Sequence, residues 1–205
     1  METAVQSSPL SARVLRRQDQ TRQNILAAAT PLFVDQGIHG TSVGDILDAA
    51  DVSRGTFYKF FRNRNDVAAH IIRPMFIHLG DALGRIDSAD PFEVIDSIIA
   101  VYADAWRESP DALLLATRDG PALYEWFESE HGLARDHLRR LLEQVEPHGI
   151  LRAGKADYAV ALLARTTVTV LRVFAGDPDW EHLFASTLRG YLIDDPHDTP
   201  AEKLT

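Results

Sequence analysis

Apolar side chains recur along this chain at intervals of three and four residues, which is the spacing of an amphipathic helix. The clearest stripe lies near the C-terminus and consists of Trp180, Leu183, Phe184, Thr187, Leu188 and Tyr191. No segment alternates apolar and polar residues with a period of two, and no Asn-Gly pair marks a hairpin turn, so no strand is predicted. The sequence therefore predicts an all-α fold of about nine helices, separated by proline and glycine.

The composition narrows the class of protein. The 205 residues are 45% hydrophobic and 25% charged, which is ordinary for a globular protein with a sizeable core. No run of about 18 apolar residues and no signal peptide is present, so we expect no membrane contact and a cytoplasmic location. The chain has no cysteine, which excludes disulfides, zinc-thiolate sites and a cysteine nucleophile.

The net charge of −9 is unevenly distributed. Residues 1–65 hold eight basic and six acidic side chains, a balance of +2, which leaves −11 for the remainder. Between Val52 and Arg64 there are four basic residues and no acidic one. A short basic element on an acidic body can contact DNA phosphates while the body is repelled by them.

Two short predicted helices, Val43–Ala50 and Arg54–Phe60, are joined by a turn of about three residues, as in a helix-turn-helix. Ser42 and Ser53 are suited to cap them. The second helix of such a motif needs buried residues to hold it and exposed donors to contact DNA. Val52, Phe57 and Phe61 can hold it, whereas Arg54, Thr56, Tyr58, Lys59, Arg62 and Arg64 can make the contacts. On this pattern alone, a solvated basic face of an ordinary helical hairpin remains the alternative.

Residues 25–67 resemble the N-terminal domain of TetR-family transcriptional repressors. The matching elements are Ile25-Leu26-Ala27-Ala28-Ala29, Leu32-Phe33, Gly37, Gly40-Thr41-Ser42-Val43, Ile46, Ala49-Ala50, Val52-Ser53-Arg54-Gly55-Thr56-Phe57-Tyr58, Phe61, Asn63-Arg64 and Val67. The resemblance implies that Thr41 and Arg64 contact phosphates, that Ser53, Arg54 and Thr56 begin the recognition helix, and that Tyr58 contacts a phosphate or base. The candidate DNA contacts are thus Thr41, Ser42, Ser53, Arg54, Thr56, Tyr58, Lys59, Arg62 and Arg64.

The resemblance also implies an architecture and a mode of action. We expect a three-helix DNA-binding domain over 16–65, a larger helical effector-binding and dimerisation domain over 66–195, and flexible tails over 1–15 and 196–205. The implied function is a homodimeric repressor that a small-molecule effector releases from a palindromic operator. The chain departs from the family at Pro31 in the first helix, at Asp51 in place of a turn glycine, and at Lys59-Phe60.

Two long predicted helices, 155–174 and 180–192, are apolar on more than one side. The first presents Leu162, Leu163, Thr166, Val170, Val173 and Phe174. One chain has few helices left to cover both, so we expect a homodimer packed as a four-helix bundle. The alternative is that both helices complete a monomeric core.

A ligand pocket is expected among helices 66–84, 91–108, 110–119 and 122–146. Its aromatic candidates are Phe76, Tyr102, Trp106, Tyr124, Trp126 and Phe127. Tyr102 and Trp106 are four residues apart on one helix face and carry polar groups, which makes them the better candidates. A pocket lined in this way predicts a largely apolar effector, although aromatic residues of this kind often belong to the core.

Glu128 and His131 have the Glu-x-x-His spacing of carboxylate di-iron bundles. Such sites need two copies of the motif and two further glutamates, and no second copy is present. We therefore expect no metal, cofactor or catalytic residue, no enzymatic activity, and an exposed His131. A helical enzyme or metal protein that uses this pair stays an alternative, as does a regulator controlled by a partner protein.

Overall fold

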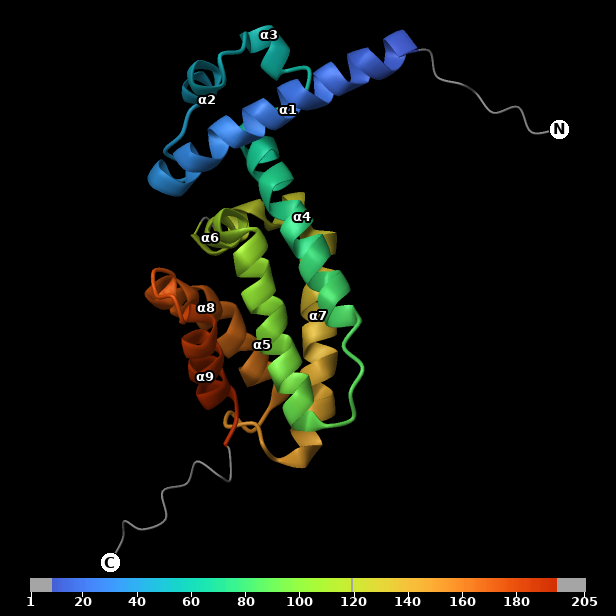
Figure 1. Ribbon diagram of the computed structural model, residues 1–205, viewed down its shortest axis with the longest axis vertical. Coiled ribbons are helices and arrows are strands. Elements are labelled where there is room, and N and C mark those ends of the chain that lie inside the picture. The colour runs from blue at the N-terminus through green and yellow to red at the C-terminus, as the bar shows by residue number, and fades with distance from the viewer. Residues whose placement is uncertain (1–8, 119, 195–205) are drawn as a thin grey trace, which may run out of the picture. The chain divides into compact units, whose positions relative to one another are not determined.

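The computed structural model describes residues 9–118 and 120–194 (Figure 1). These residues form nine α-helices and two short 3₁₀ helices, and the one β-type pairing among them is an isolated bridge between Leu151 and Ile193. The prediction of an all-α fold is confirmed. None of the described helices combines the length and the apolar character needed to cross a membrane.

The chain divides into two compact units, Met1–Ile71 and Ile72–Thr205. The division falls within helix α4 (Arg64–Gly84), and the boundary predicted at residue 66 lies in the first turn of the same helix. The predicted tails at 1–8 and 195–205 lie outside the described residues. Residues 9–15, predicted as part of a flexible tail, instead form the beginning of α1, so that part of the prediction is wrong.

The first unit consists of α1 (Pro9–Gln36), α2 (Val43–Ala50), α3 (Arg54–Phe57) and the start of α4. Its core is built from side chains of all four helices and the segment after α3, and contains Ile25, Ala29, Phe33, Ile46, Phe57, Phe61 and Val67. Pro31 lies on the exposed side of α1, which continues to Gln36. Gly37 then takes a positive φ of 79°, and its N–H donates to the Phe33 carbonyl (2.9 Å), as expected of a glycine that ends a helix.

The second unit contains the rest of α4 and five further α-helices. These are α5 (Pro91–Glu108), α6 (Pro110–Arg118), α7 (Glu128–Val145), α8 (Ala156–Phe174) and α9 (Trp180–Leu192), with 3₁₀ helices η1 (Gly120–Trp126) and η2 (Glu146–His148) on either side of α7. Helix α8 packs on α7 and α9, and α5 packs on α7 and α9. Asp90 caps α5 by accepting from the N–H of Phe92 (2.8 Å), with Pro91 at the first helical position.

The single helix predicted over Ala122–Glu146 is wrong, because the chain forms η1 and then α7, with a break at Phe127. Phe127 has φ −146° and ψ 29°, outside the helical region, and its side chain is buried. Its ring stacks on Phe76 of α4 with centroids 5.2 Å apart. Burial of this large ring against an element far away in sequence overrides the local preference for one continuous helix.

Candidate nucleic-acid interface

Helix α2 begins with a reciprocal pair of hydrogen bonds. Ser42 Oγ accepts from the backbone N–H of Asp45 (3.1 Å), and Asp45 Oδ2 accepts from the backbone N–H of Ser42 (2.7 Å). The two bonds form a capping box, and they confirm Ser42 as the cap predicted from the sequence. The hydrogen bonds to the backbone and side chain of Ser42 hold the pKa of the Asp45 carboxyl below its ordinary value.

We expect this cap to make stability depend on pH in acid. Because the folded-state pKa is lowered, the contribution of Asp45 is complete above its ordinary pKa of 3.8 and is lost as the pH falls through the lower folded value. Thermal unfolding of the wild type and of Asp45→Asn, followed between pH 6 and pH 2, measures the effect. The difference between the two proteins should shrink as the pH falls, and a constant difference would contradict the assignment.

The turn between α2 and α3 depends on Asp51. With φ 50° and ψ 50°, Asp51 has the left-handed conformation, and it is the one non-glycine residue with positive φ among those the structure describes. Its N–H approaches the Asp48 carbonyl (3.4 Å), and the N–H of Val52 donates to Leu47 (3.2 Å). Aspartate tolerates this conformation better than most residues, so the turn forms without the usual glycine.

Helix α3 is shorter than the predicted Arg54–Phe60. Ser53 Oγ caps it by accepting from the N–H of Thr56 (3.1 Å), and it also shares a hydrogen bond with the Thr56 hydroxyl (2.9 Å). The helix ends at Phe57, and residues 58–60 continue in tighter turns, in which the N–H of Phe60 donates to Phe57 (2.9 Å). Hydrogen bonds between residues three apart commonly tighten the last turn of a helix in this way.

The two sides of this segment differ sharply in exposure. Phe57 and Phe61 are buried in the core of the first unit, and their ring centroids lie 5.8 Å apart. Arg54 and Lys59 are exposed, and Tyr58 is 50% exposed. Two phenylalanines thus anchor the segment from behind, and two cations and a phenol face solvent.

Arg62 and Arg64 follow α3 and have different surroundings. The Arg62 side chain is 78% exposed, and its Nε lies 3.5 Å from the Asp66 carboxylate. Arg64 is half-buried, and its guanidinium donates to the carbonyls of His39 (3.1 Å) and Thr41 (3.0 Å). Arg64 therefore braces the loop between α1 and α2, a role that the sequence did not indicate.

The prediction that the Thr41 side chain contacts a phosphate is wrong. Thr41 is fully buried, and its hydroxyl donates to the Gly37 carbonyl (2.9 Å). Packing against the end of α1 places this side chain inside the first unit, so it cannot reach a ligand in solvent. The other eight candidates are the N-caps of α2 and α3, residues of α3, and residues that follow α3 up to the first residue of α4. Thr56 and Arg64 are half-buried, and the rest are exposed.

Comparison with known proteins agrees with this geometry. The family model described as "Bacterial regulatory proteins, tetR family" matches residues 25–71, which include α2, α3 and the start of α4. Residues 25–71 thus match the N-terminal domain of the TetR family. This confirms the resemblance found in the sequence.

Curated relatives of the chain are HTH-type transcriptional regulators. The chain is 37% identical over 93 residues to the HTH-type transcriptional regulator AcrR of Shigella flexneri, a match that covers 44% of this chain and 43% of AcrR. The chain thus matches less than half of the length of that relative. It is 28% identical over 191 residues to the HTH-type transcriptional regulator BetI of Paraburkholderia xenovorans (strain LB400), covering 89% and 88% of the two chains.

Solved structures share the fold beyond the N-terminal unit. The ketosteroid transcriptional regulator KstR2 of Mycobacterium tuberculosis superposes with a TM-score of 0.67 at 19% identity, covering 85% of this chain and 95% of that one. The fatty acid degradation regulator FadR of Bacillus halodurans gives a TM-score of 0.65 at 16% identity, covering 93% and 98%. At these identities the likeness establishes the fold.

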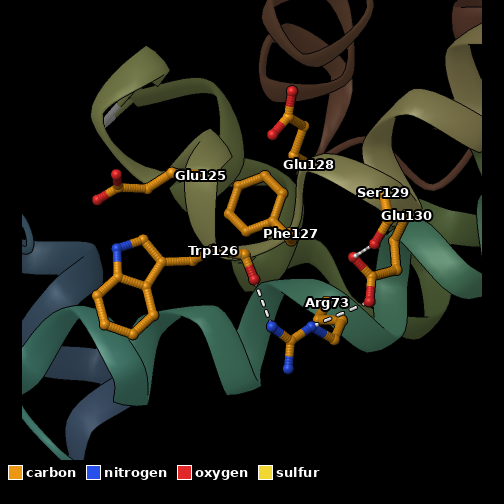
Figure 2. A pocket seen from close by; sticks show the side chains of 7 residues that line it. All are labelled: Arg73, Glu125, Trp126, Phe127, Glu128, Ser129 and Glu130. Carbon is orange, nitrogen blue, oxygen red and sulfur yellow. Dashed lines mark hydrogen bonds and ion pairs between the residues drawn. The ribbon is translucent and has the colours of Figure 1, made fainter.

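In the second unit, the residues predicted to line a pocket do not all lie together. Phe76 and Phe127 are buried and stacked together. Trp126 and Phe127 line a hollow of about 380 Å³ with Arg73, Glu125, Glu128, Ser129 and Glu130 (Figure 2). Tyr102 and Trp106, the favoured candidates, lie on α5 and are not part of that lining.

One arginine and three glutamates line the hollow, and the arginine is paired with one of the glutamates. Arg73 donates to the backbone carbonyl of Trp126, and its Nε lies 3.2 Å from a carboxylate oxygen of Glu130 (Figure 2). The Ser129 hydroxyl donates to the other oxygen of Glu130 (2.8 Å). Partial burial acts to raise the pKa of Glu130, but the Ser129 hydrogen bond and the charge of Arg73 leave it below its ordinary value. The carboxylates of Glu125 and Glu128 add negative charge at the same place.

His131 is not the exposed residue that the sequence predicted. It is half-buried, its ring stacks on Tyr124 at 4.6 Å, and it meets the edge of Phe76 at 5.0 Å. Burial, with a smaller contribution from the charge of Arg135, lowers the pKa of the imidazole. No group of three or more potential metal ligands occurs among the described residues, so nothing here completes a site around Glu128 and His131.

Two polar side chains of the second unit are shielded from water, Tyr102 partly and Thr167 almost completely. Burial raises the pKa of the Tyr102 phenol to about 12, so this group stays protonated at neutral pH. Thr167 of α8 is 2% exposed, and its hydroxyl has no hydrogen-bond partner in the part of the chain that the structure describes. A buried hydroxyl without a partner destabilises the folded state by about 1–3 kcal/mol.

We therefore expect Thr167→Val to stabilise the protein. Valine keeps the shape and removes the unpaired hydroxyl, so the free energy of unfolding should rise by about 1 kcal/mol, or about 2–4 °C in Tm for a chain of this size. Differential scanning calorimetry measures the shift. Thr30→Val is the matched control, since the hydroxyl of half-buried Thr30 already donates to the Leu26 carbonyl (2.8 Å) and its removal should bring no gain. Equal shifts in both variants would contradict the assignment.

Proposed function

We propose that the protein is a DNA-binding transcriptional regulator, a homodimeric repressor that a small, largely apolar effector releases from a palindromic operator. The observation that carries the proposal is the exposure of Arg54, Tyr58 and Lys59 on a segment held in place by buried Phe57 and Phe61. An element of this kind can enter a major groove, because its contacting side chains face outward while its backbone is fixed by the core.

The surface of α8 and α9 supports a dimer. Helix α8 buries Leu163 within its own chain but leaves the rest of its predicted apolar face half-buried or exposed, namely Leu162, Thr166, Val170, Val173 and Phe174. Helix α9 buries Phe184 and Leu188, whereas Trp180, Leu183, Thr187 and Tyr191 are half-buried or exposed. A second copy that covers these two faces makes a four-helix bundle with twofold symmetry, which suits a palindromic site.

The aromatic interior of the second unit supports an effector with an apolar body. Phe76, Tyr124, Trp126 and Phe127 lie around or next to the hollow beside η1, and a ring or aliphatic group can pack against them. Of the three carboxylates that line the hollow, Glu130 is paired with Arg73. The negative charges of Glu125 and Glu128 would repel an anionic effector.

Selection of bound duplexes from a random DNA pool tests the proposal. We expect an enriched inverted repeat and protection of both half-sites in a footprint. If four cations per subunit each neutralise a phosphate, the logarithm of the binding constant should fall with the logarithm of salt concentration with a slope of about −7 or steeper. A compound screen for release of that duplex then tests effector control. Failure to enrich any sequence would refute the proposal, whereas release by no compound and by a partner protein would refute effector control alone.

A further inference from the structure

Residues 13–20 of α1 make little side-chain contact with the rest of the first unit. All side chains from Arg13 to Gln20 are exposed, and the first buried residue of the helix is Ile25. The stretch from residue 13 to residue 24 therefore extends about 18 Å as a helix before its side chains enter the core. In Figure 1 this end of α1 continues beyond α3, which lies in the same unit.

An exposed helical segment of this length is not stable through its own packing. Isolated helices shorter than about 12–15 residues are marginal in water, and most helices in proteins are stabilised by burying one face. Here even Val14 and Leu15 are more than half exposed. A helix that presents its full circumference to solvent has a surface available for a second molecule.

The charge of this segment indicates which molecule. Arg13, Arg16 and Arg17 are spaced by three and four residues, so they share one face of α1. With Arg22 and the single acid Asp19, residues 9–24 carry +3 in a chain whose net charge is −9. Complementarity therefore favours a dense polyanion, and the element proposed to contact DNA, α3, belongs to the same compact unit.

We propose that residues 13–22 of α1 form a second DNA-contacting element, which binds backbone phosphates flanking the half-site contacted by α3. This inference rests on the proposed DNA-binding function. Arginine contacts to phosphate and sugar add affinity and extend the footprint without reading bases. The aliphatic side chains of Val14 and Leu15 can lie against deoxyribose between the phosphate contacts.

The test uses the full-length protein and the selected operator, with and without additional base pairs on each flank. In Arg13→Gln/Arg16→Gln/Arg17→Gln, we expect at least tenfold weaker binding to the long duplex and a salt slope smaller in magnitude by up to about 5, for six contacts per dimer. Shortening the duplex should weaken the wild type by a similar factor and the variant hardly at all. Footprints should lose their outer protection and keep the half-sites.

A matched variant controls for total charge. Arg85→Gln/Arg135→Gln/Arg140→Gln removes the same number of charges from exposed positions of the second unit and should leave affinity, slope and footprint as in the wild type. Circular dichroism verifies that both variants keep the wild-type Tm. If the α1 variant binds long and short duplexes as the control does, the inference is overturned while the proposed function stands.

Two further outcomes are distinguishable. If the wild type selects no sequence from the pool, the proposed function fails and this inference with it. Vesicles of anionic lipid provide the remaining comparison: arginine-dependent binding to vesicles, combined with unchanged binding of the α1 variant to long duplexes, would assign this surface to a membrane and overturn the inference.

Discussion

Tyr58→Ala/Lys59→Ala is expected to abolish the operator footprint and to weaken specific binding by at least about 100-fold, since each contact contributes about 1–3 kcal/mol and a dimer loses four. Both side chains face solvent, so the double variant should keep the wild-type Tm. Electrophoretic mobility shift and footprinting on the selected duplex measure the loss.

The control for this variant removes exposed side chains elsewhere. Arg85→Ala/Arg140→Ala, both in the second unit, should leave the footprint intact. A Tyr58→Ala/Lys59→Ala protein that still protects both half-sites would show that α3 does not recognise the operator.

Val173→Glu is expected to convert the dimer into monomers. Val173 is 71% exposed in the single chain, so a charge there should not disturb folding of a protomer. In a bundle of α8 and α9 from two chains, each copy would bury an unpaired carboxylate, at a cost of about 3–5 kcal/mol. The dissociation constant of the dimer should rise by more than about 100-fold. Sedimentation velocity should therefore show a monomer at micromolar concentration.

Leu133→Glu provides the comparison for Val173→Glu. Leu133 on α7 is 49% exposed and lies outside the proposed interface, so the same type of substitution should leave the oligomeric state unchanged. Monomeric Val173→Glu should also lose most of its operator affinity, because one half-site then binds alone. A wild type that is already monomeric, or a dimeric Val173→Glu, would contradict the proposed interface.

Local signals in the sequence predicted much of the fold and of the candidate site. Ser42 and Ser53 mark helix starts through hydrogen bonds between residues three apart, and such bonds can be inferred from a short stretch of chain. The ends of α5, α8 and α9 were likewise predicted to within a residue or two. The exposed and buried sides of α3 followed from helical spacing.

Most errors arose where packing between elements decides the outcome. Thr41 is buried by the end of α1, and Phe127 interrupts a helix because its ring stacks on Phe76 of another element. His131 is half-buried by the same aromatic group. The helical start of α1 was missed because residues 9–15 lack the apolar spacing that burial produces. The contacts of Thr41, Phe127 and His131 likewise leave no periodic pattern in the sequence.

The two hydrogen bonds of Arg64 have an entropic consequence. An exposed arginine or lysine loses up to about 2 kcal/mol of rotamer freedom when it is immobilised against a partner. The Arg64 side chain is already ordered by the carbonyls of His39 and Thr41, and the remaining N–H groups of its guanidinium are still donors. A phosphate held at this position would therefore meet a preorganised cation, whereas the flexible ammonium of Lys59 must be ordered in the act of binding.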